Sequence, residues 1–295
     1  MTDVATETAL GALRLGGYVG YVLVAGTIAF SALIWPGGFR DRTLIRLGGY
    51  GAVLAMLTTI ADPVVRAVSY GSALDGAGGR AGAVAAVLRI AVLVLVLTLL
   101  PDLASDREAG RGRRLAAGAA AAAIAVSYVV QSDASTANLP ALAFVATTLH
   151  VAATASWLGG LVALAVVAVP HAHRANLHAI LPRFSILAVV CVVTLTVTGL
   201  LHAVLAAGGI RPLLSSMYGL VLVIKIGLFG LMLLLGNQGR AYATRLARRE
   251  IEDFDASTTP VGLRVLAVAI GAELSLALGV LAVTALLVAV APTSS

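Results

Sequence analysis

Charged residues are scarce in this sequence. Lysine, arginine, aspartate and glutamate make up 12% of its 295 residues, whereas 60% of the residues are hydrophobic. A soluble domain of this length cannot bury so much apolar surface. The composition therefore excludes an ordinary water-soluble protein and predicts a chain that lies in a lipid bilayer.

Cysteine is almost absent, since Cys191 is the only one in the chain. A single cysteine excludes an intrachain disulfide framework and a CxxC metal site. Walker, nucleophile-elbow and HExxH motifs are missing as well. Because these motifs mark common catalytic sites, we do not expect an enzyme.

Long apolar runs dominate the chain instead. They predict an all-α, polytopic membrane helical bundle of eight transmembrane helices, each about long enough to cross a hydrocarbon core of ~30 Å at ~1.5 Å per residue. The predicted spans cover residues 9–35, 43–62, 81–100, 115–130, 141–169, 184–207, 218–236 and 265–291.

Arginines are concentrated in alternate connections between these spans. They cluster after spans 1, 3, 5 and 7, whereas the connections after spans 2, 4 and 6 contain few. Because basic loops stay in the cytoplasm, this pattern predicts that both termini lie outside, an N-out/C-out topology. The net charge of +6 then follows from topology and contact with anionic lipid, so we expect no nucleic-acid partner.

Two segments of the chain align with each other. Residues 83–102 match residues 219–238 at an offset of 136, which places Arg89 opposite Lys225. A further match pairs a glycine of span 1 with a glycine of span 5, Gly26 with Gly160, at an offset of 134.

These matches predict an internal 4+4 repeat. The first four-helix half would cover residues 1–140 and the second would cover residues 141–295. Both halves would share one orientation, because four is an even number of helices. Repeat transporters usually hold their working site between the halves near mid-membrane, so polar residues within the spans are the most informative.

Span 5 carries a histidine inside its apolar run. Helical spacing places on one stripe Thr147, His150, Thr154, Trp157 and Leu161. The two hydroxyls make this stripe the more polar side of the helix, so it should face the bundle. The glycines that follow, Gly159 and Gly160, would let a neighbouring helix approach closely. The imidazole of His150 is then either a neutral group hydrogen-bonded to another helix or a metal ligand.

A second histidine, His202, lies near the outer end of span 6. Spans 5 and 6 are joined by a short connection and should be antiparallel neighbours, so the two histidines could share an ion that enters from outside. Cys191 lies on the same face as His202 and ~16 Å deeper by helical rise. It is either a soft second ligand for monovalent copper or a small core residue. Met56, in the outer half of span 2, is a similar candidate.

Three charged residues lie seven or more positions inside the predicted spans: Arg89, Lys225 and Glu273. Each charge costs ~2.5–3.5 kcal/mol at the bilayer centre, so such residues need partners. We expect Lys225 and Glu273 to form either a fixed ion pair that orients spans 7 and 8 or an ion-linked switch. Arg89 and Lys225 would repel a cation, so both must be neutralised or turned away from its path.

Four segments follow one another in the second half of the chain. They read TLHVAATASWLGGL, RFSILAVVCVVTLTVTGLLHA, SSMYGLVLVIKIGLFGLMLLLGNQGR and LRVLAVAIGAELSLALGVLAVTALLVAVAP. Their succession resembles the CopD family of bacterial copper-resistance membrane proteins and covers residues 141–291. The matching elements are His150 with Trp157 and Gly160, Arg183, Tyr218 with Lys225, Asn237 with Arg240, and Glu273.

The resemblance implies copper movement across the cytoplasmic (inner) membrane of a bacterium, usually uptake, often beside a separate periplasmic CopC-like copper-binding protein. Copper would be the substrate rather than a cofactor. This chain lacks a methionine-rich or cysteine-rich copper motif, so the assignment depends on the two histidines and the resemblance. One alternative is a haem-binding membrane redox or oxidase-assembly protein with His150 and His202 as axial ligands. Another is a transporter for a different solute, such as an anion attracted by Arg89 and Lys225.

Overall fold

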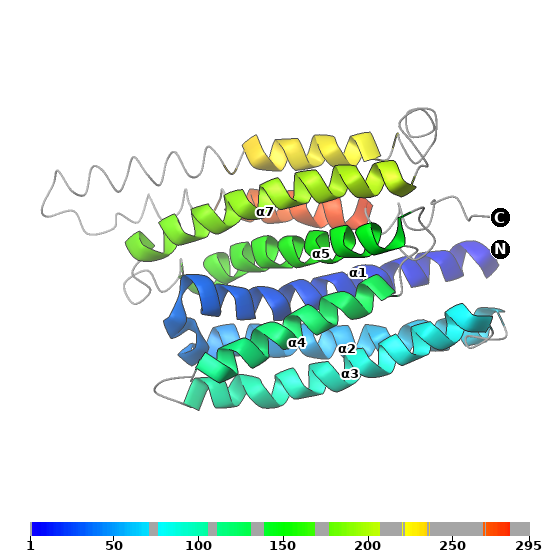
Figure 1. Cartoon of the computed structure of the whole chain (residues 1–295), viewed down its shortest axis with the longest axis horizontal. Coiled ribbons are helices and arrows are strands. Elements are labelled where there is room, and N and C mark those ends of the chain that lie inside the picture. The colour runs from blue at the N-terminus through cyan, green and yellow to red at the C-terminus, as the bar shows by residue number, and fades with distance from the viewer. Residues whose placement is uncertain are drawn as a thin grey trace, which may run out of the picture.

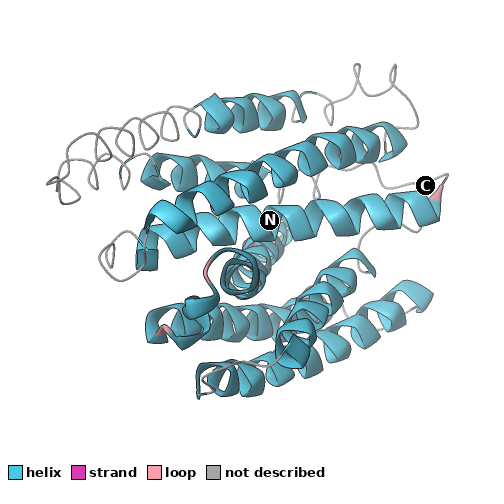
Figure 2. Ribbon diagram, turned by 60° about the vertical axis from the view of Figure 1, so that its left-hand side comes forward, coloured by secondary structure: helices cyan, strands magenta, loops and turns pink. Residues whose placement is uncertain are grey.

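The structure is a computed structural model, and all of its regular elements within the described residues are helical (Figure 2). It describes residues 2–70, 76–105, 111–130, 139–168, 177–206, 220, 222–234, 236, 268 and 270–283. The long α-helices are α1 (Thr2–Ala29), α2 (Arg42–Tyr70), α3 (Gly76–Ser105), α4 (Arg111–Val130), α5 (Pro140–Ala163) and α7 (Leu177–Ala206). Two further helical stretches are Leu222–Leu234 and Ile270–Val283.

Five helices are long and apolar enough to cross a membrane. They are Thr6–Ile34, Arg42–Ser69, Gly82–Leu99, Pro140–Val166 and Ala179–His202. Shorter apolar helices at Leu115–Val130, Leu222–Leu234 and Ile270–Val283 fall within the predicted spans 4, 7 and 8. Their described parts are 10–17 residues long, which is too short to establish all eight crossings. The predicted all-α membrane bundle is confirmed, with five candidate spans.

The outward faces of the long helices are apolar. Large hydrophobic side chains that are more than half exposed include Leu57, Val68, Val87, Ile186 and Val197. In water this surface would be costly, whereas in a bilayer it is the surface that contacts lipid tails.

α1 occupies the middle of the bundle. It packs against α2 and α4 on one side and against α5 on the other, while α5 also packs against α7 (Figure 1). α3 contacts α2 and α4 and completes a separate layer. The α1–α5 contact therefore joins the first four helices to the rest of the described bundle.

Glycines permit the closest helix contacts. A Cβ on Gly26 of α1 would overlap the Cα of Gly159 of α5, and the reverse substitution would overlap Gly26. A Cβ on Gly160 would lie 2.6 Å from the ring of Phe184 on α7. The two adjacent glycines thus let α5 approach a different neighbour on each side, as small residues do in membrane helices.

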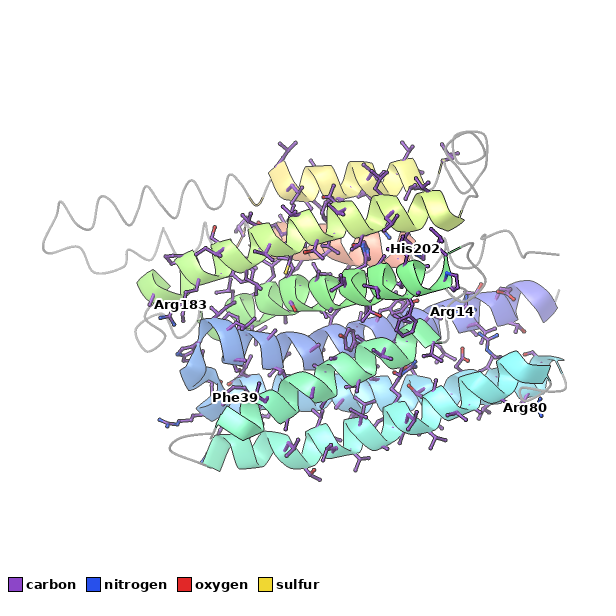
Figure 3. All side chains as sticks on the ribbon, viewed as in Figure 1. Arg14, Phe39, Arg80, Arg183 and His202 are labelled. Atoms are coloured by element: carbon purple, nitrogen blue, oxygen red, sulfur yellow. The ribbon has the colours of Figure 1, made fainter. Side chains whose placement is uncertain are left out.

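Two π-helices interrupt the regular geometry. α1 passes into a π-helix at Phe30–Ile34, and α5 passes into one at Leu164–Ala168, 134 positions later. A short 3-10 helix, Pro36–Arg40, follows the first π-helix. At the same end of the bundle the Arg183 guanidinium donates to the Ile34 carbonyl at 3.3 Å, which ties α7 to the end of the first π-helix (Figure 3).

α2 and α7 extend beyond the spans predicted for them. α2 continues to Tyr70 through Pro63, beyond the predicted end at residue 62, and α7 begins at Leu177 and contains Pro182 rather than beginning at residue 184. Proline breaks helices in water, but packed neighbours and side-chain hydroxyls can satisfy the freed backbone groups in a membrane bundle.

Candidate metal site

The two predicted histidines lie on packed neighbouring helices. The His150 Nδ1 on α5 is 3.0 Å from the Thr198 Oγ1 on α7. The His202 Nδ1 on α7 is 3.1 Å from the Thr147 Oγ1 on α5. Each histidine thus contacts a threonine of the opposite helix, and we call these contacts the two histidine–threonine pairs. Figure 3 shows His202 beside α5, near the end of α7.

Backbone carbonyls fix both threonine hydroxyls. Thr198 donates its hydroxyl hydrogen to the Thr194 carbonyl at 2.6 Å, and Thr147 donates to the Ala143 carbonyl at 2.7 Å. The residue after Thr198 leaves room for the ring, because a Cβ on Gly199 would lie 3.1 Å from the His150 Cε1. The His150 ring is therefore held on one side by a hydroxyl and on another by a glycine.

Lys225 belongs to the same region. It is half-buried on the helix Leu222–Leu234 and acts electrostatically on both His150 and His202. Trp157 positions this helix, since its ring packs edge-to-face against Phe229 with the centroids 5.7 Å apart. The predicted stripe on α5 thus faces the bundle and meets a third helix there.

Lys225 and Glu273 lie at different levels of the bundle. The buried Glu273 carboxylate lies against Gly236, where an added Cβ would be 2.7 Å from its Oε1. Gly236 follows Lys225 by eleven residues, or ~16 Å of helix, which is too far for a lysine side chain to reach. The ion pair recorded among the described residues joins Arg66 to Asp62 at 2.8 Å.

Arg89 is held within the first four helices. Its Nε donates to the Ser127 hydroxyl and its Nη2 to the Ser127 carbonyl, both at 2.9 Å. Its guanidinium carbon lies 3.6 Å from the centre of the Tyr128 ring. The Tyr128 hydroxyl in turn donates to the Gly17 carbonyl at 2.9 Å. Arg89 therefore links α3 to α4 and, through Tyr128, to α1.

Cys191 and Met56 pack in the hydrophobic core. Cys191 is a buried free thiol, and Met56 is partly buried against the same cluster. Within the described parts of the chain, no three side chains of the histidine, cysteine, aspartate and glutamate types are grouped to hold a metal. Cys191 is consequently not brought to the two histidines.

Sequence reasoning missed several partners of the site. Phe229 and Gly199 had no assigned role, and Ser127 and Tyr128 were not linked to Arg89. The sequence could have indicated Gly199, because it follows Thr198, which lies on the face of α7 that carries His202. The pairing of Ser127 with Arg89 has no comparable local signal, because the two residues are separated by 38 positions.

The fold and this site define a multi-pass helical membrane protein with a pair of histidines between two of its helices. Residues 178–287 match the family model CopD, copper resistance protein D. The match contains His202, Lys225 and Glu273, and it confirms the resemblance inferred from the sequence. No curated protein and no solved structure matches the chain.

Proposed function

We propose that the protein is a copper permease that takes copper through the cytoplasmic membrane of a bacterium, from the outer face inward. The observation that carries this proposal is the arrangement of His150 and His202 in two histidine–threonine pairs between α5 and α7. Imidazole is a common ligand for copper, and the family match supports copper as the substrate.

The charged residues support a path along the second half of the chain. Arg89 is bound to Ser127 and stacked on Tyr128, so its charge is not directed at a cation near the histidines. Lys225 remains close to them and lowers their affinity for a cation by repulsion. A conducting site must bind its ion weakly enough to release it. Repulsion from Lys225 keeps the affinity of the histidines for the ion low.

The two π-helices support the proposed internal repeat. They are related by an offset of 134, the same offset that relates Gly26 to Gly160. We propose two halves in parallel, residues 1–140 and 141–295, with eight crossings and both termini outside. The offset places Gly16 at the position of His150, so only the second half carries a histidine there.

The packing of the histidines argues against a haem held between them. Each imidazole bonds to a threonine of the helix that carries the other imidazole, so α5 and α7 touch at this level. A macrocycle with His150 and His202 on its opposite faces would have to separate the two helices. An anion transporter would need both Arg89 and Lys225 to attract its substrate. Arg89 is hydrogen-bonded to Ser127, which counts against this alternative.

A periplasmic copper-binding partner of the CopC type fits this proposal. It would deliver copper to the outer ends of α5 and α7. His202 lies at the outer end of α7 if the arginine-rich connections are cytoplasmic. The family match is the support for this partner, and the chain itself contributes the two histidines that would receive the metal.

Copper accumulation in copper-starved cells tests the proposed function. Cells would express the wild type, His150→Ala or His202→Ala at matched membrane levels, with Leu149→Ala as the control because Leu149 is half-exposed on the outside of α5. We expect the wild type and Leu149→Ala to raise cell copper and the two histidine variants not to do so. If the wild type leaves cell copper unchanged, the permease proposal is wrong.

A further inference from the structure

We infer that Thr147 and Thr198 are positioning residues that place the hydrogen of both imidazoles on Nδ1 and leave Nε2 as the copper-binding nitrogen of each. This inference rests on the proposed copper permease and names the ligand atoms and the oxidation state that its site takes. It follows from the hydrogen bonds of the two histidine–threonine pairs.

The hydrogen count of Thr198 determines the role of His150. A threonine hydroxyl has one hydrogen, and a carbonyl oxygen can only accept a hydrogen bond. The Thr198 hydroxyl lies 2.6 Å from the Thr194 carbonyl, so its hydrogen is used there. Its oxygen can then only accept from the His150 Nδ1, 3.0 Å away. We therefore assign the hydrogen of the neutral His150 ring to Nδ1.

The second pair reaches the same result from the opposite helix. The Thr147 hydroxyl lies 2.7 Å from the Ala143 carbonyl, so its oxygen accepts from the His202 Nδ1 at 3.1 Å. The two assignments depend on different carbonyls and on different helices. Their agreement indicates that both imidazole rings are oriented in the same way.

A fixed tautomer makes the other ring nitrogen a ligand. In a neutral imidazole with its hydrogen on Nδ1, the Nε2 carries the lone pair. Metal-binding histidines commonly donate the hydrogen of their second nitrogen to a neighbour, which fixes the ring and increases its basicity. Thr147 and Thr198 occupy that supporting position, so each Nε2 would offer copper a lone pair without the release of a proton.

The available donors favour monovalent copper. Divalent copper prefers tetragonal sites with several nitrogen and oxygen ligands, whereas monovalent copper accepts few ligands. The described part of the chain groups no third histidine, cysteine or carboxylate with His150 and His202. Lys225 also favours monovalent copper, because its positive charge repels a doubly charged ion twice as strongly as a singly charged one.

Nitrogen NMR of the histidine side chains tests the inference directly. The full chain, labelled with ¹⁵N-histidine in lipid bilayers, would be measured with and without Ag⁺, a redox-inert substitute for monovalent copper. His150 and His202 would be assigned from His150→Asn and His202→Asn. We expect both rings to carry hydrogen on Nδ1, and Ag⁺ to shift the Nε2 signals.

Variants of one threonine separate positioning from packing. Thr198→Val should introduce the Nε2-protonated form at His150 alone and weaken Ag⁺ binding by about 10–100-fold, whereas Thr198→Ser should restore both. Thr196→Val is the matched control, because the Thr196 hydroxyl also bonds to its own helix but is exposed on the outside of α7. It should change neither readout.

The possible outcomes distinguish this inference from the proposed function. Hydrogen on Nε2 in the wild type would overturn the inference even if cells still accumulate copper through the protein. Hydrogen on Nδ1 together with no response to Ag⁺ would overturn the ligand assignment and count against a histidine copper site. The wild-type tautomer can be measured even if Thr198→Val fails to fold.

Discussion

Replacing Gly159 by alanine places a methyl group at the point where α1 and α5 are closest. The added Cβ would overlap the Gly26 Cα and press on the Val22 carbonyl oxygen. Both are backbone atoms, so no side-chain rotation can relieve the contact and the helices must move apart. Overpacking of this kind costs about 1–3 kcal/mol, and a backbone contact belongs at the upper end. The higher helix propensity of alanine returns up to about 1 kcal/mol, which leaves a net loss of about 2 kcal/mol.

Unfolding of the purified protein in detergent, followed by tryptophan fluorescence, measures this loss. The controls are Gly49→Ala on α2 and Gly118→Ala on α4, where an added Cβ meets no atom within 4 Å. Both controls should be as stable as the wild type or slightly more stable. The double variant Gly26→Ala/Gly159→Ala should lose less than the sum of its single variants, because both methyl groups disrupt one contact. If Gly159→Ala unfolds like the controls, the tight α1–α5 crossing is refuted.

Three further predictions concern single side chains. Arg89→Lys should lower the free energy of unfolding by about 2 kcal/mol, because lysine cannot reproduce the two hydrogen bonds to Ser127. It should leave Ag⁺ binding unchanged. Altered binding would place Arg89 in the metal path. Lys225→Leu should tighten Ag⁺ binding in a titration by about tenfold or more, because it removes a positive charge that acts on both histidines. Weaker binding would contradict the proposed repulsion. Cys191→Ala should retain copper accumulation, because the thiol is buried in the core; loss of accumulation at matched expression would make Cys191 a ligand.

The long helices could be predicted from the sequence because hydropathy and helical periodicity are local properties. Apolar runs place the five long candidate spans correctly, and the spacing from Thr147 to Trp157 identifies the face of α5 that is turned inward. The boundaries of α2 and α7 were harder to predict. Proline usually ends a helix in water, but Pro63 and Pro182 both lie within helices here.

The contacts of the site depended on the register between helices, which the sequence does not contain. Spacing of three residues from Thr147 to His150 and of four from Thr198 to His202 permits reciprocal pairing on antiparallel helices, but it does not require it. The depth of Glu273 relative to Lys225 depends on how their two helices are shifted along their axes. The structure places the Glu273 carboxylate at Gly236, eleven residues after Lys225.

The π-helix at the end of α5 changes the direction in which later side chains point. A π-turn holds about one residue more than an α-turn, so the faces of the helix shift by up to ~100° across Leu164–Ala168. The inward stripe that contains His150 therefore ends near Leu164, and its continuation points in another direction. A cation that moves inward along this stripe has to be transferred to the surface of another helix at that level. The matching π-helix after α1 is followed at Trp35 by non-helical backbone, so the first helix ends there.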